Sequence, residues 1–191
     1  MITSISKMHP YWNVRDLVLT RSGELTAFNL SYYDYVPQSL VDNRIIFSVP
    51  FQDFVCEKYI SKIIEQTPAG CELAFHADVQ CVDGVTRHIP MIDMSTASIA
   101  QREKLRPFLG DDLFSGFRWY KSGRSYHGYG TELLVYSEWV HLMGRLLLAN
   151  QKALAHTVDP RWIGHRLMAG YAALRWTKNT KHYLELPRLI A

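Results

Sequence analysis

The chain has 191 residues, of which 48% are hydrophobic and 13% are aromatic. This length and composition are enough for one full hydrophobic core, built as a single unit or as two packed halves, and they exclude a disordered chain. The formal net charge of +3 is too small to indicate nucleic-acid binding by itself. No apolar run reaches the length of a membrane-spanning helix, so we expect no membrane partner.

The three cysteines, Cys56, Cys71 and Cys81, form no CxxC pair, and any set of disulfides would leave one of them out. Reduced thiols of this kind are typical of the cytoplasm. The N-terminus also lacks the basic and then apolar order of a signal peptide. We therefore expect a cytoplasmic protein.

The first third of the chain reads as a small α/β unit. Residues 12–20 and 24–33 are rich in β-forming residues and flank the turn at 21–23, which predicts a hairpin. Residues 44–49 form a short apolar strand candidate. The apolar spacing that starts at Phe51 predicts a helix that ends before Pro68.

The dipeptide Asp83-Gly84 is favoured in two-residue type I′ hairpin turns, and it lies between the β-rich runs 72–82 and 85–95. If Val82 pairs with Val85, the register follows by counting. It places Asp78 opposite Ile89, His76 opposite Met91, and Ala74 opposite Asp93.

Because side chains alternate along a strand, this register predicts one core face and one polar outer face. The core face carries Leu73, Phe75, Ala77, Val79, Pro90, Ile92 and Met94. The outer face carries His76, Asp78, Gln80, Arg87, Met91, Asp93 and Ser95. A polar outer face is common in antiparallel sheets. Asp93 is more informative, because a solvated face does not require a lone acid within the apolar run 89–94.

Residues 117–130, FRWYKSGRSYHGYG, read as two extended segments joined by a tight Ser-Gly-Arg turn. Ser122, Arg124 and His127 surround this turn. A hydroxyl, a guanidinium, an imidazole and the backbone N–H groups of a glycine turn can all donate hydrogen bonds to phosphate oxygens. The stretch therefore predicts an anionic ligand, and the alternative is a basic, solvated hairpin turn.

Three helices are predicted after residue 95. They cover residues 96–109, with an irregular end at Pro107, and residues 137–154, which carry an apolar stripe. The third begins after Asp159-Pro160, which reads as an N-cap followed by proline at the first helical position, and it ends near Gly170. The remaining residues, 171–190, alternate short extended pieces with basic side chains.

Four of these features resemble the archaeo-eukaryotic primases in their order along residues 70–190. They are MIDMS (91–95), SGRSYH (122–127), the helix entered by Asp159, and LRWTKNTKHY (174–183). The resemblance to primase small subunits and primase-polymerases implies an α+β fold for a single domain over residues 1–191. An RRM-like antiparallel sheet, about residues 71–191, would pack against the N-terminal α/β unit, about residues 1–70, with the active-site cleft between them.

The resemblance also implies a DNA-directed nucleotidyltransferase that uses Mg²⁺ or Mn²⁺. Hard carboxylate oxygens are the ligands that these ions prefer. On this template Asp93 and Asp159 are catalytic metal ligands, and the triphosphate is held by Ser122, Arg124 and His127, with Arg175 and Lys181 or His182 further out.

The chain departs from the family at one place, because the family usually has two acids separated by one residue, and Asp93 has Met91 and Ser95 at those positions. Asp78, with His76 as a possible further ligand, is one substitute as a catalytic metal ligand. Alternatively the domain is catalytically degenerate and binds nucleotides or single-stranded nucleic acid.

A third hypothesis is an RRM-like module that binds single strands through Trp119, Tyr120, Tyr126 and Tyr129. The expected partners are nucleoside triphosphates and a single-stranded DNA or RNA template. Because the chain has no helicase motif, a helicase or another replication or defence protein would act from a separate chain.

Overall fold

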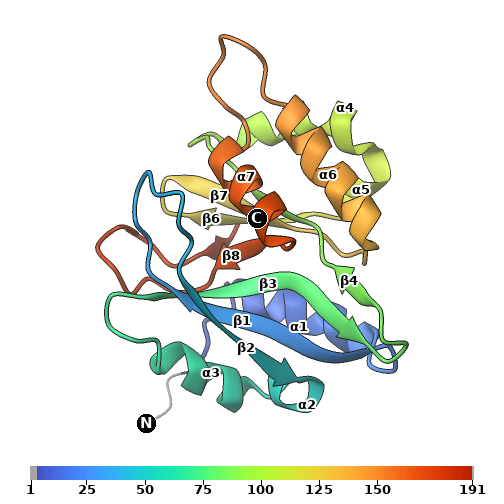
Figure 1. Ribbon diagram of the computed structural model, residues 1–191, viewed down its shortest axis with the longest axis vertical. Coiled ribbons are helices and arrows are strands. Elements are labelled where there is room, and N and C mark those ends of the chain that lie inside the picture. Colours follow the sequence, from blue (N-terminus) through green and yellow to red (C-terminus); the bar gives the residue numbers. More distant parts are fainter. Residues whose placement is uncertain (1–3, 191) are drawn as a thin grey trace.

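Two antiparallel sheets form the framework of the protein. The structure is a computed structural model that describes residues 4–190. Within these residues sheet A has five strands in the order β2-β1-β3-β4, with β8 also paired to β3, and sheet B has four in the order β5-β7-β6-β9. Figure 1 shows sheet A in the lower half and β8 between β3 and the hairpin of β6 and β7. The expected α+β class is confirmed.

Sheet A combines β1 (Leu25–Tyr33) and β2 (Arg44–Pro50) with β3 (Glu72–Cys81), β4 (Thr86–His88) and β8 (Ala173–Arg175). Sheet B combines β5 (Met91–Asp93), β6 (Arg118–Ser122), β7 (Ser125–Tyr129) and β9 (Arg188–Leu189). Because β1 pairs with β3, the two parts of the chain on either side of residue 70 share one sheet. Most buried apolar side chains of both sheets belong to one continuous cluster, and Tyr33, Ala74 and Ala173 of sheet A form a second, small one.

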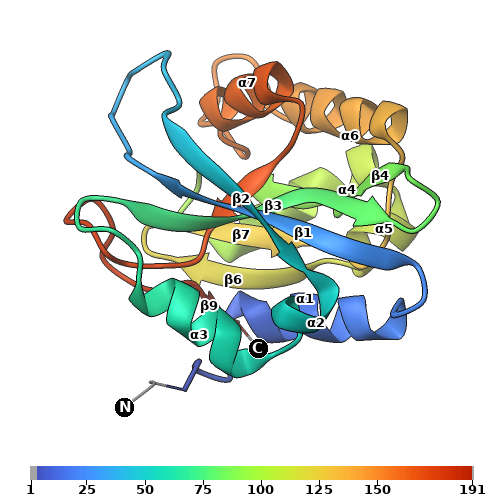
Figure 2. The ribbon, with the colours of Figure 1, turned by 60° about the horizontal axis from the view of Figure 1, so that its bottom comes forward.

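The helices lie on two sides of the sheets. Figure 2 shows α1 (Pro10–Thr20), α2 (Phe51–Phe54) and α3 (Glu57–Glu65) below sheet A, and α6 (Tyr136–Leu148) and α7 (Pro160–Ala169) on the opposite side. The segment before β6 contains the 3-10 helix η1 (Ile99–Leu105), α4 (Arg106–Leu109) and α5 (Asp111–Ser115). No helix within residues 4–190 has both the length and the apolar character needed to cross a membrane.

The predicted strand over residues 12–20 is wrong, because this segment forms α1. His9 caps the helix by accepting a hydrogen bond from the Tyr11 N–H at 3.1 Å, and Pro10 occupies the first turn, where its missing N–H has no cost. Tyr11, Val14 and Val18 are buried at helical spacing. The cap and this spacing prevail over the β propensity of the residues.

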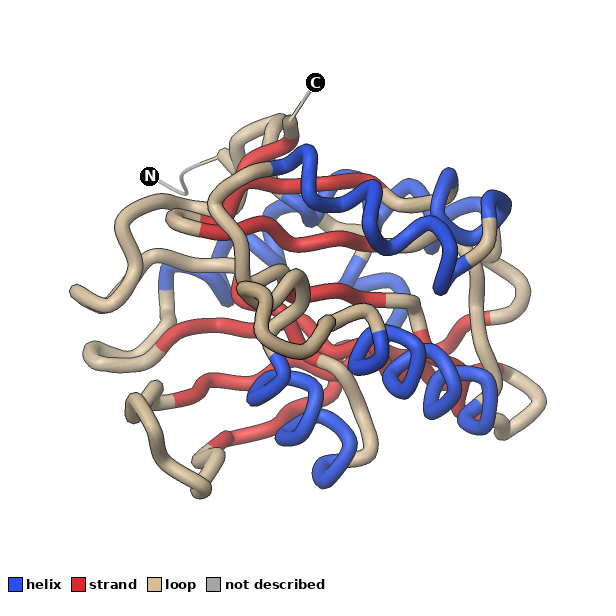
Figure 3. Tube along the Cα trace, turned by 90° about the horizontal axis from the view of Figure 1, so that it is seen from above, coloured by secondary structure: helices blue, strands red, loops and turns tan. Residues whose placement is uncertain are grey.

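The strands expected next are confirmed as β1 and β2, and the helix expected after Phe51 is present but divided into α2 and α3. The helix expected over residues 137–154 ends earlier, at Leu148. The loop that joins it to α7 projects at the top of Figure 1 and faces the viewer in Figure 3. The cap at Asp159 and the left-handed Gly170, with φ of 81°, bound α7 as predicted.

The turn at Asp83-Gly84 is present, but the predicted register is wrong by one residue. Asp78 pairs with His88 rather than with Ile89. Gly84 has a φ of 77°, and the Cys81 N–H bonds to the carbonyl of Val85, so Val82 belongs to the loop. A longer loop that ends in a left-handed glycine is the second common way to close a hairpin.

The second arm of this hairpin does not continue along β3, so Ala74 does not lie opposite Asp93. Ala74 pairs with Arg175 of β8, whereas Asp93 pairs with His127 of β7 in the other sheet. The strand changes sheets at Pro90, which has no N–H for a ladder. The predicted core face is buried, but His76 and Met91 on the predicted outer face are buried as well.

Candidate active site

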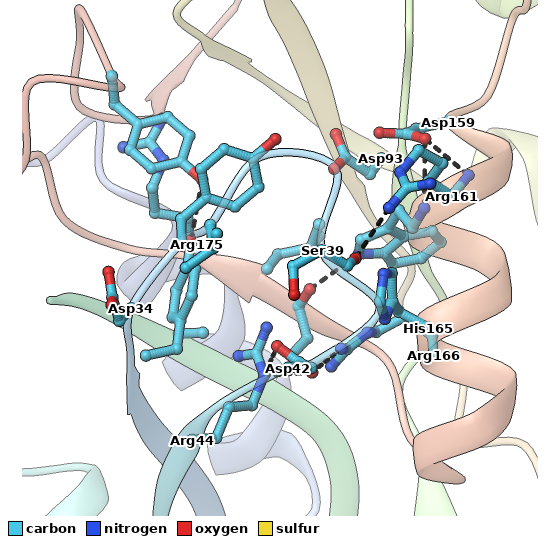
Figure 4. Close-up of a pocket in the computed structure, with 18 of the residues that line it drawn as sticks. Asp34, Ser39, Asp42, Arg44, Asp93, Asp159, Arg161, His165, Arg166 and Arg175 are labelled. Atoms are coloured by element: carbon cyan, nitrogen blue, oxygen red, sulfur yellow. Dashed lines mark hydrogen bonds and ion pairs between the residues drawn. The ribbon is translucent and has the colours of Figure 1, made fainter.

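A pocket of about 210 Å³ opens where β5, β7, β8 and the start of α7 meet the loop over residues 34–43. Figure 4 shows acidic and basic side chains facing it from these elements. The acids are Asp34, Asp42, Asp93 and Asp159. The basic residues are Arg44, Arg161, Arg166, Arg175, His127 and His165. The pocket is therefore lined by charges of both signs.

Asp93 and Asp159 come together because two segments far apart in sequence pair through their backbones. Met94 forms an isolated β-bridge with Val158. The Asp159 N–H donates a hydrogen bond to the Asp93 carbonyl at 2.9 Å. The two carboxylates therefore enter the pocket from adjacent backbone positions, although β5 and α7 are separated by most of the second half of the chain.

The carboxylate of Asp159 is oriented by the helix that it caps. Its Oδ1 accepts hydrogen bonds from the N–H groups of Arg161 at 2.8 Å and Trp162 at 3.2 Å. Asn150 holds the preceding segment: its Oδ1 accepts from the Thr157 and Val158 N–H groups, and its Nδ2 donates to the Val158 carbonyl. Sequence reasoning missed Asn150, because the predicted helix over 137–154 made it an ordinary helical position.

The electrostatics of Asp93 are unfavourable for the ionised carboxylate. Burial and the neighbouring charge of Asp159 raise the pKa of Asp93 to about 8, against a smaller opposite effect of Arg175. His127 Nε2 lies 3.7 Å from Asp93 Oδ1. Burial and the charge of Arg175 hold the pKa of His127 well below its usual value, so this imidazole is neutral and does not balance the two acids. This end of the pocket favours a cation.

Arg175 lines the pocket together with the two acids and is 4% exposed. Its Nη2 donates to Ser122 Oγ at 2.7 Å, and its Nη1 donates to the carbonyls of Thr177 and Glu185. The guanidinium lies 4.0 Å from the centre of the Tyr183 ring, and its Nε has no hydrogen-bond partner. Arg175 and Ser122 thus form a fixed group of donors beside the acids.

Glu72 holds the segment that follows Arg175 in place. This fully buried carboxylate accepts hydrogen bonds from the side chains of Thr177 and Thr180 and from the backbone N–H groups of Asn179 and Thr180. Glu72 is the first residue of β3, which pairs with β8. No sequence pattern had singled out Glu72, because its partners lie more than a hundred residues further along the chain.

The predicted phosphate-binding residues divide into two groups. Ser122, His127 and Arg175 line the pocket. Arg124 and Lys181 are exposed and do not line it, and neither does His182. The predicted hairpin around the Ser-Gly-Arg turn is confirmed as β6 and β7, with Gly123 at a φ of 75°.

Asp78 does not line this pocket, and the expectation that it shares a face with Asp93 is wrong, because the two residues belong to different sheets. Its Oδ2 accepts a hydrogen bond from Asn29 Nδ2 at 2.6 Å, and its Oδ1 lies 3.6 Å from His76 Nδ1. His76 Nε2 in turn bonds to Ser31 Oγ at 2.8 Å. The reason is the change of sheet at Pro90, which separates Asp93 from β3.

The four aromatic residues proposed for strand binding are buried. Their exposed fractions are 5% for Trp119, 2% for Tyr120, 7% for Tyr126 and 0% for Tyr129. Nucleobases stack on exposed ring faces. Binding of single strands through these four rings is therefore contradicted.

Sequence reasoning also missed the basic residues on α7. Arg161 and His165 stand four residues apart on this helix, and Asp159, Trp162 and Arg166 follow the i, i+3, i+7 spacing of one helical face. Helical counting from Asp159 could have found them. Asp42 and Arg44, which face α7 across the pocket, gave no such signal, because Asp42 lies between predicted elements and Arg44 is the first residue of an apolar strand candidate.

Within the described residues no group of three or more His, Cys, Asp or Glu side chains could hold a metal ion. Asp93 and Asp159 nevertheless suit a Mg²⁺ ion. Mg²⁺ commonly takes only one or two carboxylates from the protein and completes its shell with water and phosphate oxygens. Two facing carboxylates, one of them with a raised pKa, are a donor set that such an ion would stabilise.

A comparison with protein families finds one relationship. The model of the family described as "Archaeo-eukaryotic primase 1D-like" matches residues 54–188, which is more than half of the chain. The match includes Asp93, Ser122, His127, Asp159 and Arg175. No curated protein and no solved structure matches the chain.

Proposed function

The chain belongs to the archaeo-eukaryotic primase 1D-like family and is a primase/polymerase-like domain, and from this we propose that it is a metal-dependent nucleotidyltransferase. It would transfer nucleotides from nucleoside triphosphates to the 3′-hydroxyl of a nucleic-acid strand or nucleotide. A single-stranded DNA or RNA template and a helicase or other replication or defence protein on a separate chain are its proposed partners. The sheet with the SGRSYH hairpin would be the RRM-like unit.

The observation that carries this proposal is the placement of Asp93 and Asp159 in one pocket with Ser122, His127 and Arg175. Phosphoryl transfer needs little covalent chemistry from the protein. It needs the triphosphate and the attacking hydroxyl to be positioned, and it needs the developing charge to be stabilised. Paired acids beside a group of fixed donors provide both.

Asp93 and Asp159 would hold the divalent ion. When bound, the ion supplies positive charge to the triphosphate and to the attacking oxygen. Asp159 is kept in one orientation by the N–H groups of α7. We propose no metal-binding role for Asp78, because Asn29 and His76 occupy its carboxylate outside the pocket.

The phosphate oxygens would be bound by Ser122, His127 and Arg175. Ser122 Oγ accepts from Arg175, so its own hydroxyl proton is free for an oxygen of the ligand. The Nε of Arg175 and the Nδ1 of His127 are buried and have no partner in the described structure. Buried donors of this kind gain a hydrogen bond when an anion enters. Arg124, Lys181 and His182 would contact only parts of the ligand that project from the pocket.

Labelled nucleotides, several templates and each of Mg²⁺ and Mn²⁺ test the proposal. We expect incorporation by the wild-type protein, and we expect Asp93→Asn and Asp159→Asn each to abolish it. Asp34→Asn is the matched control, because Asp34 lines the same pocket without lying beside Asp93. Incorporation that survives Asp93→Asn would contradict the assignment.

A second candidate function is a catalytically degenerate domain that binds nucleotides or single-stranded nucleic acid. It is favoured by Met91 and Ser95, which flank Asp93 where the family usually carries a further acid. Met91 is fully buried and has no oxygen that could bind the ion. Triphosphate binding by the wild-type protein without incorporation under any of the conditions above would favour this function.

A further inference from the structure

A second polar cluster lies in the same pocket, away from Asp93 and Asp159. It consists of Asp42, Arg44 and Arg166. Figure 4 shows Asp42 between the two guanidinium groups, with Asp93 and Asp159 at the other end of the pocket. The proposed nucleotidyl transfer makes no use of these three residues.

The two arginines of this cluster converge on one carboxylate. Arg44 Nε donates to the two oxygens of Asp42 at 2.9 and 2.8 Å. Arg166 Nη2 donates to Asp42 Oδ2 as well. Two guanidinium groups therefore share a single acid, which leaves hydrogen-bonding capacity unused.

Arg166 shows this unused capacity most clearly. It is 2% exposed, and its Nη1 has no hydrogen-bond partner in the described structure. Burial and the charge of Arg44 lower the pKa of Arg166. Asp78, the next carboxylate, is bound by Asn29 and makes no hydrogen bond to either arginine. A buried arginine that shares its acid with another arginine is a site that a further anion would stabilise.

The arginines are fixed, whereas the acid belongs to an exposed loop. Arg44 Nη1 donates to Ser31 Oγ at 3.1 Å, and its guanidinium lies 4.3 Å from the centre of the Tyr33 ring. Arg166 is part of α7. Asp42 instead follows Leu40 and Val41, which are 80% and 65% exposed.

The loop is attached to α7 by two contacts with arginine side chains of that helix. Arg161 Nη2 donates to the carbonyl of Ser39 at 2.8 Å. Together with the bond from Arg166 to Asp42, this contact fastens the loop over residues 34–43 across the pocket. Arg44 keeps its contacts with Ser31 and Tyr33 of β1 whether or not Asp42 is bound to it.

We propose that Arg44 and Arg166 form a second phosphate-binding subsite, and that Asp42 occupies it as an internal substitute until a phosphate group displaces it. A phosphate offers the paired oxygens that a guanidinium fork binds best, and it can engage the free Nη1 of Arg166 as well. Displacement of Asp42 removes one of the two contacts between the loop and α7, and the contact of Arg161 with the Ser39 carbonyl is the other. The inference rests on the proposed function only in that the ligand carries phosphate.

The test is binding of inorganic phosphate by calorimetry, with EDTA present and with chloride at equal ionic strength as the reference. Asp42→Asn removes the competing charge and keeps the shape of the side chain. We expect it to bind phosphate about tenfold or more tightly than the wild-type protein, which is the size of one charge-assisted hydrogen bond gained. Asp112→Asn, at an exposed acid of α5 outside the pocket, should leave phosphate binding unchanged.

The double variants Asp42→Asn with Arg44→Gln and Asp42→Asn with Arg166→Lys should both lose the gain. Arg166→Lys keeps a positive charge in the buried position, and Arg44→Gln covers the case in which that variant fails to fold. The inference is overturned if Asp42→Asn binds phosphate no more tightly than the wild type. It is also overturned if the gain survives in both double variants.

Repeating the titration with a nucleoside triphosphate and with a single-stranded oligonucleotide identifies the source of the phosphate. The ligand whose affinity increases more in Asp42→Asn is the one that reaches the subsite. If the affinity increases for neither ligand, the inference is overturned. These titrations require neither a divalent ion nor nucleotide incorporation. A wild-type protein that fails to incorporate nucleotides would therefore refute the proposed function but not the subsite. If Asp42→Asn fails to bind phosphate more tightly, the subsite is refuted but not the proposed function.

Discussion

His9 offers a direct test of how the N-terminal helix is joined to the strand that carries Arg175. Its ring connects the two: Nδ1 accepts a hydrogen bond from the Tyr11 N–H, and Nε2 donates to the Trp176 carbonyl at 2.7 Å. The two bonds are made together only by the neutral imidazole, because a protonated ring has no acceptor for the Tyr11 N–H, although its Nε2 can still donate to the Trp176 carbonyl. His9 is 5% exposed, and burial lowers its pKa from 6.5 to about 4.

The sign of the effect on stability follows from this pKa. The unfolded chain binds the proton more tightly than the folded chain, so the contribution of His9 is present above pH 6.5 and is lost as the pH falls toward 4. At about 1.4 kcal/mol for each pKa unit, the full difference is about 3 kcal/mol. Between pH 7.5 and 4.5 most of it should be lost, on the order of 2 to 3 kcal/mol.

We propose to measure the free energy of unfolding by urea denaturation for the wild type and for His9→Asn. Asparagine keeps a helix-capping oxygen but loses the bond to Trp176. The variant should be less stable at pH 7.5 by about 1 to 3 kcal/mol, because the buried carbonyl of Trp176 is left unpaired. This deficit should shrink or reverse at pH 4.5, because only the wild type loses the contribution of the neutral ring.

Comparing the two proteins at each pH removes the effect of the other buried histidines, which both contain. His141→Asn is the control, because His141 is exposed on α6. A difference in unfolding free energy between wild type and His9→Asn that stays constant from pH 7.5 to 4.5 would refute the reasoning.

Four further predictions concern the site. Asp93→Asn should raise the urea midpoint of the ion-free protein at pH 8, because a carboxyl whose pKa is raised to about 8 opposes folding above its usual pKa of 3.8; a lower midpoint would contradict the repulsion from Asp159. Asn150→Ala should lower stability by about 1 to 3 kcal/mol and reduce incorporation, since it frees the segment before Asp159; incorporation equal to that of wild type would argue against a positioning role. His127→Ala should weaken triphosphate binding about tenfold, and Arg124→Ala should weaken it less, because only His127 lines the pocket; calorimetry on both variants decides between them. Mn²⁺ should support more incorporation than Mg²⁺, because Mg²⁺ demands near-ideal octahedral ligation and the site offers few carboxylates; equal rates with the two metals would count against an incomplete ligand set.

Local signals in the sequence predicted the local structure well. The Asp83-Gly84 turn, the β6–β7 hairpin and the cap at Asp159-Pro160 each depend on a few neighbouring residues, and all three are present. The order of the acidic, Ser-Gly-Arg and basic segments was also enough to identify the family. The error at residues 12–20 arose from reading β propensity where the His9 cap and the helical spacing of buried residues decide.

The geometry of the site depends on contacts between residues far apart in sequence, and counting along one hairpin could not supply them. Asp93 pairs with β7 and not with β3, because Pro90 ends the hydrogen-bond ladder with β3. The bridge between Met94 and Val158 places Asp159 beside Asp93. Asp42, Arg44 and Arg166 meet only because a loop of sheet A crosses to α7. Turns and caps are determined by the few residues that form them, so the sequence alone located the Asp83-Gly84 turn, the Ser-Gly-Arg turn and the Asp159 cap, although not the loop length of the first. The pairing of strands and the meeting of charges are determined by which distant segments bury each other, and only the tertiary structure decided that.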